Sequence, residues 1–216
     1  MFSTIRLFLV FVFVFFFLLL LKKTGAIRKK VGYVLICAIA IFLIFALPFV
    51  PFENAFFTFK SPMQAFNYYN STSKEIKLVI KGESTDFVVG GDADSNINLI
   101  IPKTDNGWKI GLGKDIKRVF QRNIEGYSIC VYQYKDSDEY YLSVLKVDGG
   151  NFKISDEFNS EFYSISKYND SLNETHYTYY AYIPSFNAQY SVFLDGAEIC
   201  IGTQGNGSSV SDASNN

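Results

Sequence analysis

Residues 2–52 read FSTIRLFLVFVFVFFFLLLL (2–21), KKTGAIRKK (22–30) and VGYVLICAIAIFLIFALPFVPF (31–52). Two apolar runs therefore flank a short loop that holds five basic residues and no acid. A helix that crosses the hydrocarbon of a bilayer needs roughly 20 apolar residues, and both runs have that length. The pattern predicts a transmembrane hairpin at residues 1–52, with helices at about 2–21 and 31–50.

The basic loop at residues 22–30 predicts the orientation of this hairpin. Short loops rich in Lys and Arg stay in the cytoplasm, so the N-terminus and everything after residue 52 are expected on the outer side. The chain is then a multi-pass cell-membrane protein, and the lipid bilayer is its first partner. The alternative is a signal peptide that is removed. The second run has the basic start of such a peptide, although no A-x-A pattern ends it.

After the hairpin, the periodicity of apolar residues predicts one helix and then many strands. A short helix is expected from Ser61, because Ser is a common N-cap, Pro62 suits the first helical position and Gln64 can reach back to the cap. From Glu75 onward apolar and polar residues alternate, as in half-buried strands. The expected strands are 75–81, 85–89, 97–101, 108–112, 116–121, 127–134, 140–147, 152–154, 162–165, 176–183, 190–194 and 197–201.

Together these elements predict a membrane-anchored α+β chain. Its extracytoplasmic domain, residues 53–201, is expected to be a mainly antiparallel β-sandwich or curled sheet with one short N-terminal helix. The strongest hairpin signal is at 127–147, where KDSDE separates two strands rich in tyrosine. Residues 202–216 (GTQGNGSSVSDASNN) are small and polar, so we expect a disordered tail.

Charge is distributed unevenly along the 216 residues, whose formal net charge is −1. All six basic residues before Glu53 belong to the hairpin, so the remainder holds 14 basic and 21 acidic residues, a net charge of −7. A domain this acidic is a poor match for nucleic acid, which binds proteins that neutralise its phosphates. It is also a poor match for anionic lipid surfaces. The excess of Lys over Arg and the many Asn, Ile, Phe and Tyr residues are typical of bacteria with AT-rich genomes.

The chain has three cysteines. Cys37 lies in the second apolar run, and Cys130 and Cys200 lie in expected strands. On the outer side of a membrane these last two are candidates for a disulfide. The alternative is that both are small buried apolar side chains. Sequence spacing does not choose between these, because a disulfide requires Cα atoms within about 7 Å.

Signatures of catalysis are weak. His176 is the only histidine, and no G-x-S-x-G motif accompanies it, so nucleophilic catalysis with a histidine base is not expected. Residues 92–96 (DADSN) begin like a calcium loop, but Ile97 stands where the loop needs glycine. We therefore expect no metal, no cofactor and no enzymatic activity. Acid pairs such as Asp156 and Glu157 leave a hydrolase with paired carboxylates as the enzyme alternative.

Tyrosine is the most distinctive residue of the domain. It is amphipathic and common at recognition surfaces. On two of the expected strands it recurs often enough to predict an aromatic binding surface: Tyr177, Tyr179, Tyr180, Tyr182, Tyr132 and Tyr134. The alternative is that these side chains fill the sheet, because aromatic residues favour strands.

The leading hypothesis is therefore a non-catalytic, β-rich binding domain displayed outside a bacterial cell. Its partner would be another membrane or envelope protein, an envelope polymer or a small ligand. Two alternatives stay open. One is a cell-envelope hydrolase that uses paired carboxylates, and the other is an accessory subunit of a membrane complex that binds through the helical hairpin.

Overall fold

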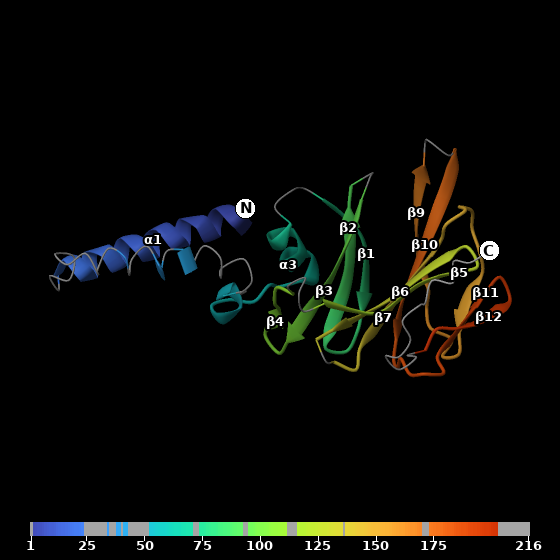
Figure 1. Ribbon diagram of the computed structural model, residues 1–216. Coiled ribbons are helices and arrows are strands. Elements are labelled where there is room, and N and C mark those ends of the chain that lie inside the picture. The colour runs from blue at the N-terminus through green and yellow to red at the C-terminus, as the bar shows by residue number, and fades with distance from the viewer. Residues whose placement is uncertain are drawn as a thin grey trace, which may run out of the picture. The chain divides into compact units, whose positions relative to one another are not determined.

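The computed structural model describes residues 2–23, 34, 38–39, 41–42, 52–70, 74–92, 95–111, 116–135, 137–169 and 173–202. Within these residues the chain is mostly β (Figure 1). Contacts divide it into two compact units, Met1–Ile116 and Lys117–Asn216. Apart from Lys22 and Lys23, the expected loop at 22–30 lies outside the described residues, and so does the expected tail after residue 202.

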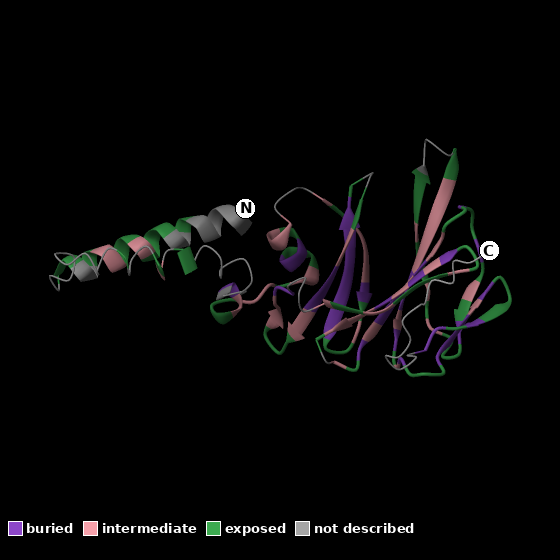
Figure 2. Cartoon of the chain, viewed as in Figure 1, coloured by how far each residue is buried: buried purple, intermediate pink, exposed green. Residues whose placement is uncertain are grey.

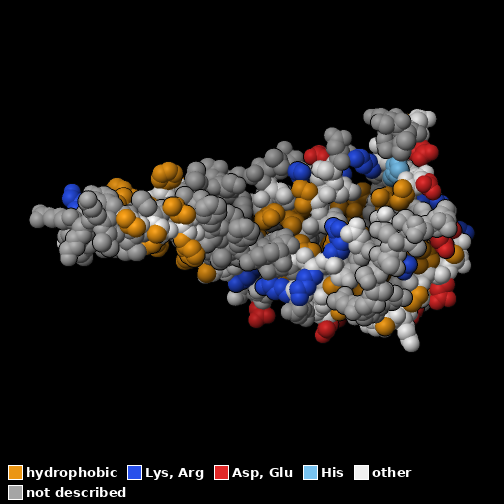
Figure 3. All heavy atoms as spheres, in the orientation of Figure 1, with side chains coloured by type: hydrophobic (Ala, Val, Ile, Leu, Met, Phe, Trp, Pro, Cys, Tyr) orange, Lys and Arg blue, Asp and Glu red, His pale blue; other side chains and the backbone are white. Residues whose placement is uncertain are grey.

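The first apolar run forms one helix, α1 (Phe2–Lys23). Several of its large apolar side chains are exposed, and Figure 3 shows apolar side chains along the helix surface. The exposed ones are Phe8, Phe11, Val12, Phe13, Phe15, Phe16 and Leu19. In the second run the described residues are Val34, Ala38, Ile39, Ile41 and Phe42.

In the described part of the chain, no helix combines the length and the hydropathy that crossing a membrane needs. The predicted two-helix transmembrane hairpin is therefore wrong, and so are the membrane-anchored fold class and the multi-pass localisation with an outer N-terminus and an outer domain. The physical reason is that the hydropathy of a run reports its composition and does not by itself establish a helix long and apolar enough to cross a membrane. The accessory-subunit alternative depended on the hairpin and loses its basis.

In the first unit, a short helix packs on a four-stranded sheet. The elements are η3 (Phe52–Ala55), α3 (Pro62–Tyr69), β1 (Glu75–Lys81), β2 (Thr85–Gly91), β3 (Asn96–Thr104) and β4 (Gly107–Trp108), and the strands pair in this order, all antiparallel. The expected helix is confirmed. Ser61 Oγ accepts a hydrogen bond from the Gln64 N–H at 3.2 Å, and Gln64 Oε1 accepts one from the Lys60 N–H at 3.1 Å.

Strand β2 forms the centre of this unit and is buried along its whole length (Figure 2). Its Val88 belongs to a core shared with Phe66 of α3 and with Leu99 and Ile101 of β3. The alternating pattern at residues 75–81 is therefore a strand at the edge of the sheet, while β2 lies inside it. Helix α3 covers the sheet by burying Ala65 and Phe66 of its apolar face in this core.

A buried carboxylate joins β2 to the β3–β4 hairpin. Asp86 is 1% exposed. Trp108 Nε1 donates a hydrogen bond to Asp86 Oδ2 at 2.6 Å, and the Lys103 ammonium lies 3.0 Å from Oδ1. A charge is tolerated inside a protein when it is paired and hydrogen-bonded. The only tryptophan is thereby held against the core of its unit.

In the second unit, two antiparallel sheets share one core. The larger sheet has the order β5 (Ile116–Ile124), β6 (Tyr127–Tyr134), β7 (Tyr140–Lys146), β10 (Glu174–Ile183) and β9 (Tyr163–Asn169). The smaller sheet has the order β12 (Ala197–Cys200), β11 (Ser191–Leu194) and β8 (Ile154–Asp156). Val131, Leu142 and Val192 are among the fully buried side chains of this core. The strong hairpin signal at 127–147 is confirmed as the β6–β7 pair.

Candidate functional site

Four of the six tyrosines proposed as a binding surface lie on β10, but they do not share a face. Successive side chains of a strand point to opposite sides of a sheet, so Tyr177 and Tyr179 lie opposite Tyr180 and Tyr182. Tyr179 packs against the core of the second unit, and Tyr180 is buried. Packing therefore occupies two of the four, which the sequence alone did not indicate.

The other two lie on β6, and one of them belongs to a row of tyrosines across the larger sheet. The register places Tyr132 opposite Tyr141 of β7, and Tyr141 opposite Tyr182 of β10. The ring centroids of Tyr141 and Tyr182 are 5.7 Å apart, edge to face. Tyr134 follows Tyr132 on the same side of β6. The six side chains are thus divided between two faces of one sheet.

The structure does not join Cys130 and Cys200, the two candidates for a disulfide. Cys130 is partly buried on β6, Cys200 is exposed on β12, and both are free thiols. The two strands belong to different sheets. Ile129 and Val131, which flank Cys130, point into the core that the two sheets share, so Cys130 points the other way. Cys37 lies outside the described residues.

The residues considered for catalysis mostly serve the fold. Asp156 is buried and accepts hydrogen bonds from the Tyr190 hydroxyl at 2.9 Å, the Ser160 hydroxyl at 2.6 Å and the Ser160 N–H at 2.8 Å. Burial, followed by the charge of Asp156, raises the pKa of Tyr190, so this hydroxyl remains a donor. Glu157, the neighbour of Asp156, is exposed. His176 lies on β10, and in the described part of the chain its buried Nε2 has no hydrogen-bond partner.

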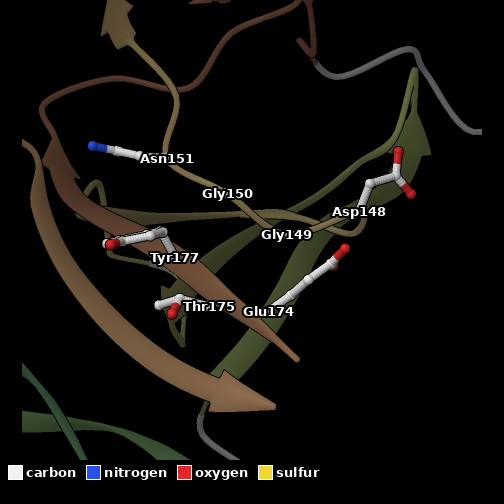
Figure 4. Close-up of a pocket in the computed structure, with 7 residues that line it drawn as sticks. All are labelled: Asp148, Gly149, Gly150, Asn151, Glu174, Thr175 and Tyr177. Carbon is white, nitrogen blue, oxygen red and sulfur yellow. The ribbon is translucent and has the colours of Figure 1, made fainter. Parts of the chain in front are cut away.

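The second unit holds a pocket of about 450 Å³ at the place where β7 leaves β10. Pairing of these strands runs from Tyr140 opposite Ile183 to Leu145 opposite Thr178. Beyond Leu145, the turn at residues 147–151 runs beside the first residues of β10 in place of a strand. Two chain segments line the pocket (Figure 4), and they contribute Asp148, Gly149, Gly150, Asn151, Glu174, Thr175 and Tyr177.

Two consecutive glycines allow this turn. Gly149 and Gly150 have φ angles of 75° and 78°, in the left-handed region where side chains are disfavoured. The Gly150 N–H donates a hydrogen bond to the Thr175 carbonyl at 2.8 Å, which ties the turn to β10. A Cβ on Gly149 would lie 2.8 Å from Glu174 Oε2. The carboxylate of Glu174 therefore rests directly on the backbone of the turn.

Asn151 is held in place by hydrogen bonds to its side-chain oxygen. Asn151 Oδ1 accepts a hydrogen bond from the Phe152 N–H at 2.9 Å and another from the Tyr179 hydroxyl. Burial, followed by the nearby Tyr177 and Asp195, raises the pKa of Tyr179, so this hydroxyl stays protonated at neutral pH. The rings of Phe152 and Tyr179 pack edge to face, with centroids 4.7 Å apart. This support leaves Asn151 Nδ2 directed to the same side as the Tyr177 hydroxyl (Figure 4).

The charge of the pocket comes from Asp148 and Glu174. Both residues are exposed, and among the described residues neither carboxylate has a hydrogen-bond or ion-pair partner. The lysine closest to Asp148 in the sequence is engaged elsewhere, since Lys146 Nζ lies 3.4 Å from Asp195 Oδ2. The pocket therefore presents two uncompensated negative charges beside an amide, a hydroxyl and an aromatic ring.

Of these pocket residues, sequence reasoning singled out only Tyr177. The turn formed by Asp148, Gly149, Gly150 and Asn151 is visible in the sequence as a turn signal between two strands. Nothing in the sequence connects it with Glu174, because the two segments meet through the pairing of β7 with β10. The pocket is a product of long-range register.

Among the residues that the structure describes, no group of three or more His, Cys, Asp and Glu side chains is placed to hold a metal ion. Two carboxylates provide fewer ligands than calcium or zinc normally takes from a protein. Comparison with known proteins found no matching family model, no matching curated protein and no matching solved structure.

Proposed function

We propose that this chain is a binding protein and that its second unit holds a small polar ligand in the pocket between the 147–151 turn and β10. The observation that carries the proposal is that unlike groups line one pocket: two carboxylates, an amide, a hydroxyl and an aromatic ring. Ligand sites typically combine a concave surface with a few placed polar groups. The bonds that fix the glycine turn and Asn151 support a preformed site.

Hydrolysis by paired carboxylates is the second candidate, because Asp148 and Glu174 line the same pocket. Hydrolases of this kind depend on surroundings that exclude bulk water and favour one protonated acid. Both carboxylates are exposed, which favours binding over catalysis. Turnover of chromogenic aryl glycosides by the full chain, abolished in Glu174→Gln, would support the hydrolase instead.

Amide chemical shifts of the isotopically labelled full chain test the proposed binding. The probes are putrescine, glucose, inorganic phosphate and calcium chloride, each titrated separately to millimolar concentration. We expect at least one probe to move the amide signals of Gly149, Gly150 and Asn151 along a saturable curve. If all four probes leave these signals in place, the proposed binding function is contradicted.

A pair of glycine variants separates the pocket from general backbone effects. Gly149→Ala places a methyl group 2.8 Å from Glu174 Oε2, so we expect it to displace the carboxylate and weaken binding by roughly tenfold, about 1.4 kcal/mol. Gly196→Ala is the control, because its φ of 88° imposes similar strain while a Cβ there meets nothing within 4 Å. Equal losses in the two variants would mean that strain, and not the pocket, explains the effect.

A further inference from the structure

Charge is the property of the pocket that restricts its ligand most. Asp148 and Glu174 are exposed and, within the described residues, unpaired. The unit that carries them, Lys117–Asn216, has 7 basic and 13 acidic residues, a net charge of −6. An anionic ligand would be repelled by both the local and the overall charge. A cationic ligand is attracted by both.

We infer that the ligand is a protonated primary amine, an inference that rests on the binding function proposed above. An ammonium group carries three donors and no acceptor, which matches the oxygens of Asp148 and Glu174. Hydrogen bonds between an ammonium and a carboxylate are about twice as strong as those between neutral groups. A bare metal ion is a poorer match, since no cluster of three ligating side chains occurs in the described residues.

The layout of the pocket also indicates what the amine is attached to. In Figure 4 the carboxyl groups of Asp148 and Glu174 lie to one side of Gly149, and the side chains of Asn151 and Tyr177 lie to the other. A ligand that contacts both sides therefore carries its ammonium group at one end of an extended stem. The aromatic ring of Tyr177 suits an aliphatic stem, and it also attracts a second cationic group by a cation–π interaction.

Two sources share this chemistry, a free diamine and a lysine side chain of a peptide. Putrescine represents the first, and a lysine blocked at both its amino and carboxyl ends represents the second. Butanediol has the same stem as putrescine but carries hydroxyl groups in place of the ammonium groups, so it is the matched neutral probe. The source is assigned to whichever amine binds the full chain more tightly.

The experiment is a titration of the isotopically labelled full chain with these three probes at low ionic strength, read at the amides of Gly149 and Gly150. We expect at least one amine to shift both signals saturably and butanediol to leave them unchanged. Higher salt should weaken the binding of the amine, because salt screens the exposed charges that attract it. If butanediol binds as tightly as putrescine, the amine inference is contradicted and the proposed binding function is not. If none of these three probes, nor glucose, phosphate or calcium, shifts the signals, both the binding function and the amine inference are contradicted.

Charge variants make the inference specific to the pocket. Glu174→Gln and Asp148→Asn keep side-chain size and remove one charge each, so each should weaken amine binding by roughly tenfold, in line with the loss of a charged hydrogen bond. Glu198→Gln is the matched control, since Glu198 is an exposed acid of the same unit on β12, outside the pocket. Weakening by Glu198→Gln as large as that by Glu174→Gln would show diffuse attraction to an acidic surface and would overturn the inference.

Discussion

Asp195 lies in the turn between β11 and β12 and receives three donors from elsewhere in the second unit. Its carboxylate accepts a hydrogen bond from the Lys153 N–H at 3.0 Å and one from the Tyr127 hydroxyl at 2.8 Å, and Lys146 Nζ lies 3.4 Å away. These donors, the Lys153 N–H first, hold the pKa of Asp195 below its usual value. Burial and then the hydrogen bond to Asp195 raise the pKa of Tyr127 to about 12.

This pair predicts how stability depends on pH. The pKa of Tyr127 is raised on folding from 10.0 to about 12, so its contribution is complete below pH 10 and is lost as the pH rises from about 10 to 12. The pKa of Asp195 is lowered from 3.8, so its contribution is present above that pH and is lost as the pH falls through the lower, folded value.

Urea unfolding followed by circular dichroism measures both effects. We expect Tyr127→Phe to reduce the loss of stability between pH 10 and about 12. We expect Asp195→Asn to reduce the loss of stability as the pH falls below the usual pKa of this residue. Tyr168→Phe is the control, because Tyr168 is 54% exposed. The same loss of stability between pH 10 and about 12 in Tyr127→Phe and in the natural chain would contradict this role of Tyr127.

At the scale of elements, the first unit depends on the close approach of α3 to β2. Gly90 of β2 lies under the Phe66 ring of α3, and a Cβ at this position would be 2.4 Å from Phe66 Cζ. The same Cβ would be 2.9 Å from the backbone oxygen of Glu75 on β1. Glycine is therefore required here for space, whereas in the pocket turn it is required for its positive φ angles.

Gly90→Ala should destabilise the first unit by about 1–3 kcal/mol, the usual cost of an overpacked core. Unfolding is measured from the fluorescence of Trp108, the only tryptophan, which packs against the same core as Phe66. The double variant Gly90→Ala/Phe66→Leu should be more stable than the sum of the two single changes predicts, since Leu removes the ring that the new methyl group meets. Strict additivity, or a Gly90→Ala variant as stable as the natural chain, would contradict this packing role.

At the scale of the whole molecule, each unit has its own sheet system and its own core. In the four-stranded and the five-stranded sheet, some strands pair on both sides and two strands lie at the edges. Strand β7 pairs on both sides, with β6 and β10, whereas β9 pairs only with β10. An edge strand leaves one row of backbone N–H groups without a partner in its own sheet, so protection of the backbone should differ between these strands.

Hydrogen exchange measures this difference directly. Amides of β7 and of the fully buried β2 should exchange slowest, near the rate of global unfolding. Roughly half of the β9 amides, those on its outer edge, should exchange quickly. The comparison of β7 with β9 is internally controlled, because both strands belong to one sheet. Exchange from β9 as slow as from β7 would mean that another chain covers this edge.

Local patterns in the sequence predicted the β-rich elements and some of their boundaries. Alternation indicated most strands, the residues around Ser61 indicated helix α3, and the KDSDE segment indicated the β6–β7 hairpin. These predictions succeed because periodicity, capping and turn chemistry act between near neighbours. The transmembrane hairpin was wrong, because hydropathy along a run does not establish a helix that crosses a membrane.

Only the tertiary structure decided which segments meet. Strand register divided the tyrosines between two faces, separated Cys130 from Cys200 and brought Asp148 to Glu174. A shift of one residue in any pairing reverses the face of every side chain on a strand. Register depends on the packing of both sheets at once, and no local pattern in this sequence specifies it. Most strands and helix α3 could therefore be predicted from the sequence alone, whereas the pocket could not.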